Sequence, residues 1–269
     1  MITRGINFKN FKIKKSSHLV KKNLNKLLKE KNEIIHSLKK NYRNSFDANF
    51  IKKYRKYINL RLIGIGGSSL GFKSIYYFLS HKIKKKVIFI DDLIHNRLNK
   101  KNKKNLNLVI SKSGNTIETI INANIIIKKK DKNIFLTEKK TNYLNLLAIK
   151  LKADVISHNN YIGGRFSVLS EVGMLPAELM GLNSKSFKRY DELIKNKKFL
   201  NSIINNVSTT LYLLKNKKFN SIIINYDKKS ENLFLWYQQL IAESLGKNNK
   251  GILPVISNMP RDNHSVMQL

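Results

Sequence analysis

The sequence predicts an α/β fold in which helices cover both faces of a mostly parallel sheet. Between residues 60 and 157, five short apolar runs alternate with segments of helical spacing, an order typical of βαβ units. The runs are continuously apolar, as expected for strands that are buried on both faces. With 269 residues, 42% of them hydrophobic, the chain can form one large domain or two ordinary ones.

A helical segment precedes the first strand. Residues 1–45 carry leucine and isoleucine at helical spacing among many lysines. The elements expected after it are a strand at 60–63, a helix at 72–80, a strand at 86–90, a strand at 106–110, a helix at 116–128, a strand at 133–136, a helix at 143–151 and a strand at 154–157.

A polar stretch at residues 183–198 indicates a domain boundary. The elements expected beyond it are a helix at 200–215, a strand at 221–225, a helix at 231–245 and an irregular segment at 247–263. One strand and two helices cannot close a second sheet, so we expect this part to be incomplete at its C-terminus. The expected organisation is a helical segment at 1–45, a first domain at 46–185 and a second, truncated domain at 186–269.

The composition excludes several classes of protein. The chain has no cysteine, which rules out disulfides, and no apolar run of membrane-spanning length, so we expect a cytoplasmic, soluble protein without membrane contact. The net charge of +35 would normally suggest a nucleic-acid partner. However, the lysines are spread along the whole chain without interleaved aromatic residues, and we expect no specific nucleic-acid binding. No cluster of His, Asp and Glu has metal-ligand spacing, so no metal is expected.

The segment at 108–119 is the most informative part of the chain. Its apolar start predicts a buried strand, and a turn rich in hydroxyl groups and a helical pattern follow. Such a turn directs hydroxyl and backbone N–H groups to one point at the positive end of a helix, which favours phosphate binding. The turn lacks the spacing of a nucleotide P-loop, so we expect a small phosphorylated ligand. The alternative is an ordinary strand–turn–helix corner. The polar residues of the turn are Ser111, Lys112, Ser113, Asn115 and Thr116.

The glycine-rich segment at 64–71 allows two interpretations. It resembles a dinucleotide fingerprint with Asp91 and Asp92 downstream, but Ser69 occupies the position of the third glycine. Alternatively, Gly67 and Ser68 let the backbone approach a sugar or phosphate closely.

Arg165 and His264 are candidate functional residues in irregular segments. Arg165 follows two glycines, where an arginine can bind an anion or stabilise developing oxyanion charge. His264 can act as an acid or base near neutral pH. Each can also be an ordinary surface residue.

Glu243 is a candidate general base. Gln239 and Glu243 are four residues apart, so they share one helix face, and Trp236 lies on that face one turn earlier. Glu243 falls in the last turn before Gly246, a C-terminal cap, where a carboxylate meets the negative end of the helix dipole. A carboxylate at this position destabilises the helix, but it can serve as a general base in catalysis. The alternative is a solvated glutamate on a helix surface.

Five segments, taken together, resemble the glucose-6-phosphate isomerase family and occur in the family's order from about residue 60 onward. They are GIGGSSLG (64–71), ISKSGNTIET (110–119), GGRFSVLSEVGMLPAELMG (163–181), WYQQLIAESLGKNNKG (236–251) and DNHSVMQL (262–269). The resemblance implies two sugar-isomerase domains, each a mostly parallel sheet between helices. It also implies reversible conversion of glucose 6-phosphate to fructose 6-phosphate through a cis-enediol, in glycolysis and gluconeogenesis, without a cofactor.

The resemblance also implies roles for individual residues. Ser111, Ser113 and Thr116 match the phosphate-binding hydroxyls, and Lys112 contributes through its backbone. Gly67, Ser68 and Gln239 match residues that line the sugar site. Arg165 matches the arginine that stabilises the enediol, and Glu243 matches the base that moves a proton between C2 and C1. His264 matches the histidine that assists ring opening and reaches the site from a neighbouring subunit, so a homodimer is implied.

Two departures from the family bear on activity. Asn263 stands where the family usually has glutamine before the histidine. The family also places a catalytic lysine well beyond the position of His264, and no residue here takes that role. The alternative function is therefore a sugar-phosphate-binding fragment without turnover.

Overall fold

The computed structural model describes residues 17–93, 105–128, 131–248 and 250–268. The first 16 residues of the predicted helical segment lie outside this part. The rest of that segment forms α1 (His18–Lys29) and α2 (Glu33–Ser37), so the prediction of helix up to about residue 45 is wrong after Ser37. New N-caps explain the break, because Asn32 caps α2 and Asp47 caps α3 (Ala48–Tyr54), a helix that we did not predict.

Five parallel strands form the main sheet, as the sequence predicts. Each of the five predicted strands is confirmed to within one residue at either end, and the sheet order is β2-β1-β3-β4-β5. The strands are β1 (Asn59–Ile63), β2 (Lys86–Ile90), β3 (Asn105–Ile110), β4 (Lys132–Thr137) and β5 (Asp154–Ser157).

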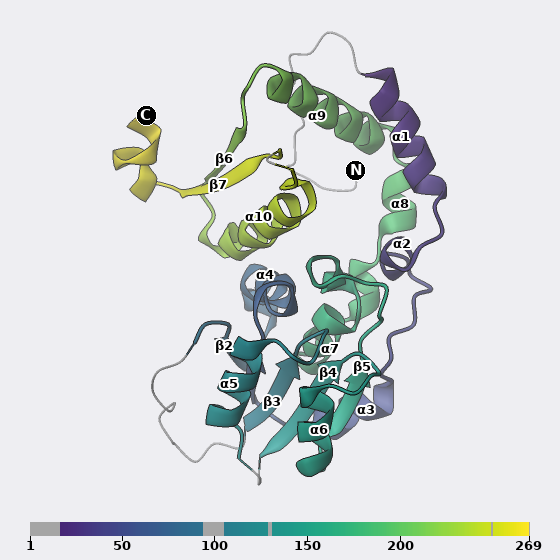
Figure 1. Cartoon of the computed structure of the whole chain (residues 1–269), viewed down its shortest axis with the longest axis vertical. Helices are drawn as coiled ribbons and strands as arrows, with labels where there is room; N and C mark the ends of the chain where they lie inside the picture. The colour runs from purple at the N-terminus through teal and green to yellow at the C-terminus, as the bar shows by residue number, and fades with distance from the viewer. Residues whose placement is uncertain (1–16, 94–104, 129–130, 249, 269) are drawn as a thin grey trace.

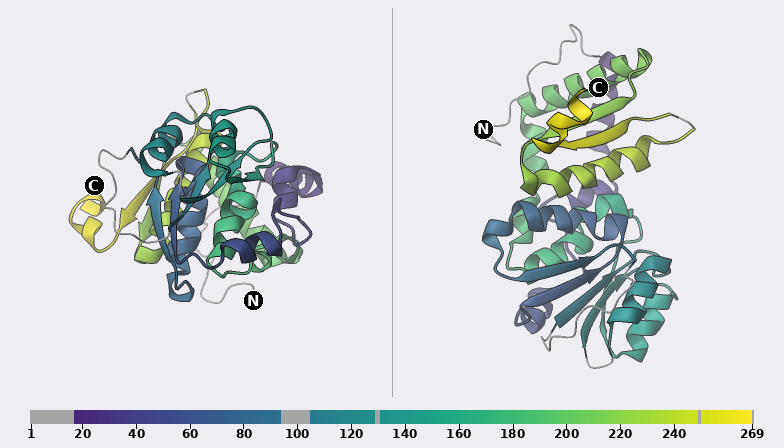
Figure 2. Two further views of the ribbon diagram at one scale, coloured as in Figure 1. Left: turned by 90° about the horizontal axis from the view of Figure 1, so that it is seen from below. Right: turned by 90° about the vertical axis from the view of Figure 1, so that its left-hand side faces the viewer.

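Helices cover both faces of this sheet (Figure 2). Alternate strand residues point to opposite faces, so Leu108 packs into one hydrophobic cluster and Val109 into the other, both fully buried. The first cluster includes side chains of α3, α4 (Leu70–Phe78) and α7 (Glu171–Leu179). The second includes side chains of α5 (Ile117–Ile126) and α6 (Tyr143–Lys150). Each fully buried Leu or Val contributes about 1.5–3 kcal/mol to folding.

The strand order creates a crevice between β1 and β3. From β1 the chain continues into α4 on one face, and from β3 it continues into α5 on the other face. The loops after these neighbouring strands therefore diverge. Ligands of open α/β sheets bind at such a point, outside the carboxyl ends of the strands.

The second part of the chain contains α8 (Tyr190–Lys195), α9 (Lys197–Lys215), β6 (Asn220–Asn225), α10 (Glu231–Leu245) and β7 (Leu253–Asn258). The prediction of an irregular segment at 247–263 is wrong, because β7 pairs with β6 in parallel over six residues. Pro254 interrupts the apolar run, and for this reason the sequence pattern did not predict a strand here. Proline is tolerated here because, within the described residues, β7 has a neighbouring strand on one side only.

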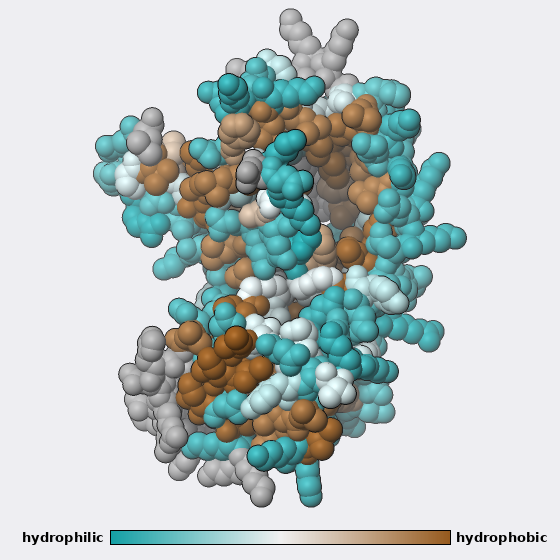
Figure 3. All heavy atoms as spheres, viewed as in Figure 1, coloured by the Kyte–Doolittle hydropathy of each residue, from teal (hydrophilic) through white to brown (hydrophobic). Residues whose placement is uncertain are grey.

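The helix α10 makes the main contact between the two parts. It packs against α4 of the first part and against β7 of the second (Figure 1). No residue of α10 is fully buried, and Ile222 and Ile224 of β6 are about half exposed. Figure 3 shows apolar surface over this upper part of the molecule, as well as over the lower part. The proposed division at residues 45 and 185 remains a prediction.

The last described residues form two short 3₁₀ turns, Arg261–His264 and Val266–Gln268, which project from the body in Figures 1 and 2. In the part of the chain that the structure describes, no helix combines the length and apolar character needed to cross a bilayer.

Candidate active site

A cavity of about 330 Å³ opens at the crevice between β1 and β3. It brings together residues from the loops after β1, β3 and β4, from the loop before α7, and from α10. Eight of the ten predicted site residues line it, namely Gly67, Ser68, Lys112, Ser113, Thr116, Arg165, Gln239 and Glu243.

The hydroxyl-rich turn after β3 forms one wall of the cavity. Ser113 and Thr116 line it, whereas Ser111 is buried beneath the turn and bonds the Thr116 hydroxyl, with 2.8 Å between the two oxygens. The Ser111 hydroxyl also accepts a hydrogen bond from the Gly114 N–H at 3.2 Å. Ser111 therefore organises the turn from below, while Ser113 and Thr116 face the cavity.

The start of α5 is available to an anion. Thr116 is the N-cap residue, but its hydroxyl bonds Ser111 and makes no capping hydrogen bond to the helix. Among the described residues, no partner accepts from the backbone N–H of Lys112, Ser113 or Thr116. Free N–H groups at a helix N-terminus attract phosphate through hydrogen bonds and the helix dipole.

Asn142, in the loop between β4 and α6, holds this turn in shape. A Cβ atom on Gly114 would lie 2.1 Å from the Asn142 amide carbon, and Gly114 has a φ of +68°. Both facts require glycine at this position. The Asn142 amide donates to the Thr137 hydroxyl at 3.2 Å and to the Lys140 carbonyl at 3.0 Å. The loop after β4 thus supports the turn after β3.

Gly67 lines the cavity and also makes a close backbone contact that the sequence does not suggest. A Cβ atom at Gly67 would lie 2.3 Å from the carbonyl carbon of Gly164. The missing side chain therefore makes room for protein backbone, and it lets the loop carrying Arg165 pack directly on the loop after β1. This contact fixes Arg165 at the edge of the cavity.

Arg165 joins that loop to α10. Its Nη1 donates to Glu243 Oε1 at 2.8 Å, and its Nε donates to the Ser244 hydroxyl at 2.9 Å. Its carbonyl accepts a hydrogen bond from the Trp236 indole N–H at 3.0 Å. The Gln239 amide donates to Glu243 Oε2 at 3.3 Å. Trp236, Gln239 and Glu243 therefore face the same loop, which confirms the predicted shared face of the helix.

Glu243 has the exposure expected of a residue that meets a ligand. Its side chain is 51% exposed at the cavity, whereas that of Arg165 is 21% exposed. Glu243 lies in the last turn of α10, and Gly246 is the C-cap, as predicted.

His264 is the one predicted site residue that lies away from the cavity. It is exposed in the 3₁₀ turn after β7 and is not among the lining residues. Asp91, the acid of the dinucleotide alternative, is also absent from the lining and pairs with Lys73 at 2.7 Å.

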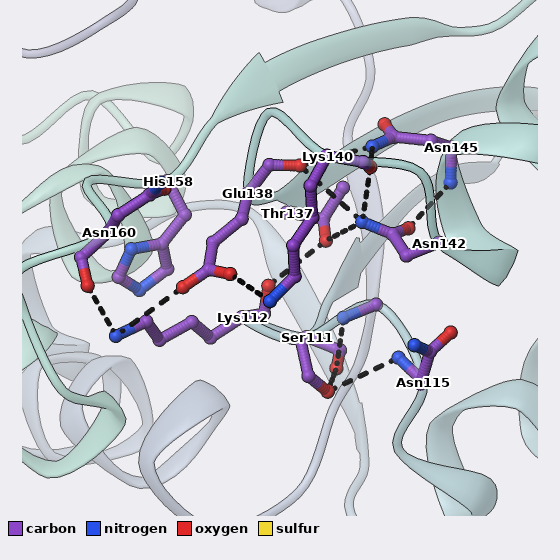
Figure 4. A network of polar contacts seen from close by, with 12 residues as sticks. Ser111, Lys112, Asn115, Thr137, Glu138, Lys140, Asn142, Asn145, His158 and Asn160 are labelled. Atoms are coloured by element: carbon purple, nitrogen blue, oxygen red, sulfur yellow. Dashed lines mark hydrogen bonds and ion pairs between the residues drawn. The ribbon is translucent and has the colours of Figure 1, made fainter.

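Two charged residues in the cavity, Glu138 and Lys140, were not predicted (Figure 4). Both follow β4 directly, and β4 pairs in parallel with β3, so they lie beside the hydroxyl-rich turn. Their place in the chain, directly after a predicted strand, could have indicated them, because the carboxyl ends of neighbouring parallel strands lie at one edge of a sheet.

Glu138 is held between two lysines. Its carboxylate oxygens lie 2.5 Å from the Lys140 ammonium and 3.4 Å from the Lys112 ammonium. Burial tends to raise the pKa of Glu138, but the hydrogen bonds and charges of the two lysines outweigh it and hold the pKa below its ordinary value. The Lys112 ammonium also donates to the Asn160 carbonyl at 2.7 Å.

Comparison with known proteins assigns the family. A family model described as phosphoglucose isomerase matches residues 13–253. The chain belongs to the phosphoglucose isomerase family.

Relatives named glucose-6-phosphate isomerase are similar to this chain over most of its length. The chain is 35% identical to glucose-6-phosphate isomerase of Methanocaldococcus jannaschii over 245 residues, which cover 83% of the chain and 60% of the relative. It is 32% identical to the enzyme of that name from Mycoplasma mycoides over 237 residues, with coverages of 78% and 54%. The chain therefore spans little more than half the length of these relatives.

Solved structures support the fold. A hypothetical protein from Thermus thermophilus superposes with a TM-score of 0.69 at 22% identity, covering 93% of this chain and 67% of the other. A tagatose-6-phosphate ketose/aldose isomerase from Escherichia coli gives a TM-score of 0.54 at 16% identity, with coverages of 82% and 62%. At these identities the likeness concerns the fold alone. It agrees with the α/β class predicted from the sequence.

Proposed function

We propose that this phosphoglucose isomerase family member interconverts glucose 6-phosphate and fructose 6-phosphate. One observation carries the proposal: the Arg165–Glu243 pair and the phosphate-binding turn face each other across a single cavity. A hexose phosphate bound by its phosphate at Ser113 and Thr116 would extend its sugar carbons toward α10. The relatives named glucose-6-phosphate isomerase support this function over a fragment that only binds the sugar phosphate.

The chemistry divides between the two walls of the cavity. At the turn, hydroxyl groups and free N–H groups bind the phosphate without taking part in bond breaking. At α10, Glu243 takes the proton from C2 to give the cis-enediol and returns a proton to C1, while the proton of the C2 hydroxyl moves to the C1 oxygen, so that no atom is gained or lost. Arg165 stabilises the negative charge that develops on the sugar oxygen, and its bond to Ser244 keeps it in place.

Glu243→Gln tests this assignment. The substitution keeps the shape of the side chain but removes the base, and its single amide oxygen can accept only one of the two hydrogen bonds that Glu243 accepts from Arg165 and Gln239. We expect turnover of glucose 6-phosphate to fall by at least about 10²-fold, while the dissociation constant for glucose 6-phosphate changes little.

Glu231→Gln is the matched control. Glu231 lies in the first turn of the same helix, accepts a hydrogen bond from Asn258 and is not among the lining residues. It should leave turnover unchanged. Near-normal turnover in Glu243→Gln would show that Glu243 is not the base.

The homodimer and the role of His264 belong to this proposal as well. Because His264 is exposed and away from the cavity of its own chain, it is available to a neighbouring subunit. A cytoplasmic location is proposed too, since a charged sugar phosphate stays in the compartment where it is made.

A further inference from the structure

The side chains of Lys140 and Glu138 stand at the phosphate-binding turn but have no role in the function described above. We propose that the Lys140 ammonium group, held in place by Glu138, binds the dianionic phosphate of the substrate together with the turn. Lys140 is then a further binding residue, and Glu138 is a positioning residue. This inference rests on the proposed function.

The fold brings Glu138 and Lys140 to this place through strand pairing that continues past the ends of β3 and β4. The Ser111 N–H donates to the Leu136 carbonyl at 3.1 Å, and the Glu138 N–H donates to the Lys112 carbonyl at 3.1 Å. The Thr137 hydroxyl donates to the same Lys112 carbonyl at 3.2 Å. The loop after β4 is thereby fixed against the phosphate-binding turn.

Glu138 directs the Lys140 side chain. The Glu138 side chain is 9% exposed and lies 2.5 Å from the Lys140 ammonium. A carboxylate this deeply buried cannot follow a mobile lysine into solvent, so the lysine must come to it. The Lys140 side chain is itself 54% exposed, and it lines the same cavity as Ser113 and Thr116. Figure 4 shows its ammonium group meeting the Glu138 carboxylate. The ammonium group is thus both anchored and accessible to a ligand.

The positive charge of Lys140 complements the negative charge of a bound phosphate. The hydroxyl and N–H groups of the turn are neutral, whereas a phosphate monoester carries about −1.5 to −2 charges at pH 7. Lys112, Lys140 and Glu138 together carry one net positive charge beside the turn. Hydrogen bonds between charged groups are roughly twice as strong as those between neutral groups, so an ammonium group here would favour the dianion over the monoanion.

The test measures binding of glucose 6-phosphate to the full chain by calorimetry. Lys140→Ala should weaken binding by about tenfold, the value of one charge-assisted contact. Its neighbour Lys139 supplies the matched control, because it is exposed and is not among the residues that line this cavity. Lys139→Ala should leave binding unchanged. The gain in affinity as the phosphate loses its second proton, near about pH 6, should be smaller in Lys140→Ala than in the wild type.

A double variant shows whether Lys140 binds the phosphate or only neutralises the charge of Glu138. Glu138→Gln combined with Lys140→Ala has the same local net charge as the wild type, because it loses one charge of each sign. If Lys140 binds the phosphate, the tenfold loss persists in the double variant. If Lys140 only offsets the carboxylate, affinity returns to the wild-type level, and the proposal is wrong.

Inorganic phosphate as a second probe separates this inference from the proposed function. It should bind weakly to the wild type and more weakly to Lys140→Ala. Loss of phosphate binding in Lys140→Ala, in a chain without turnover, would support the inference and contradict the proposed function. Unchanged binding of both probes in Lys140→Ala would overturn the inference alone. A wild-type chain that binds neither probe would overturn both.

Discussion

Glu243 and Glu138 show how the same residue type is given two roles by its surroundings. Glu243 is half exposed at the cavity, which leaves its carboxylate accessible to a substrate. Its two oxygens accept hydrogen bonds from Arg165 and Gln239. Glu138 is buried between Lys140 and Lys112, so its charge is committed to the protein. In our proposals the first residue transfers the proton and the second positions Lys140.

The role of Glu138 predicts a pH-dependent contribution to stability. Its pKa is lower in the folded protein than its ordinary value of 4.5, so its ion pairs stabilise the fold above that value and are lost as the pH falls through the folded pKa. Glu138→Gln should lower the free energy of unfolding by about 1 kcal/mol at pH 7, a modest value because both lysines are partly solvated.

Urea unfolding of the wild type and Glu138→Gln at several pH values checks this. The difference between the two proteins should shrink as the pH falls below 4.5. A difference that stays constant down to about pH 3 would mean that the ion pairs do not stabilise the fold.

Among the elements, the direct contact between two loops positions Arg165. The loop after β1 and the 3₁₀ segment Gly164–Leu169 meet through Gly67 and Gly164. The contact is asymmetric. A Cβ atom on Gly67 would lie 2.3 Å from backbone, whereas one on Gly164 would come no closer than 3.7 Å to the atoms around it.

This asymmetry predicts opposite outcomes for two similar substitutions. Gly67→Ala should push the loops apart, lower the free energy of unfolding by about 1–3 kcal/mol and reduce turnover through Arg165. Gly164→Ala should change stability by less than about 0.5 kcal/mol, because its methyl group fits at ordinary contact distance. Thermal unfolding and turnover of the two variants check the prediction. Equal losses of stability would contradict it.

For the whole molecule, the distribution of apolar surface is consistent with the proposed association between subunits. The second part exposes Ile222 and Ile224 of β6 and Leu211 and Tyr212 of α9, each by about 44–57%. Large apolar side chains that gather on one region mark surfaces that bind other polypeptides. Figure 3 shows apolar surface over the upper part of the molecule and a second apolar area over the lower part.

The proposed homodimer with His264 contributed across subunits predicts complementation. Glu243→Gln and His264→Ala should each be nearly inactive alone. In a hybrid dimer, one cavity receives Glu243 from one subunit and His264 from the other, so a mixture refolded together should recover about a quarter of the wild-type activity. Sedimentation should show a dimer. A mixture that is no more active than its components would contradict the shared site.

Local patterns were enough to predict the strands and the turn. The apolar runs of β3 and β4 are buried along nearly their full length, which makes such strands easy to recognise. The hydroxyl-rich turn at 111–116 lies at the cavity, and phosphate binding there is our proposal. β7 was missed because Pro254 breaks its pattern. Glu138 and Lys140 were missed because their place depends on β4 lying beside β3, which the local sequence does not encode.

Proton transfer at C2 is the central claim, and one measurement tests it most directly. The chain is incubated with glucose 6-phosphate in D₂O, and the products are followed by NMR. Since the proton held by Glu243 exchanges with solvent, we predict fructose 6-phosphate with deuterium at C1 in part of the product, and none with Glu243→Gln. Binding of glucose 6-phosphate without conversion or exchange of the C2 hydrogen would contradict the claim.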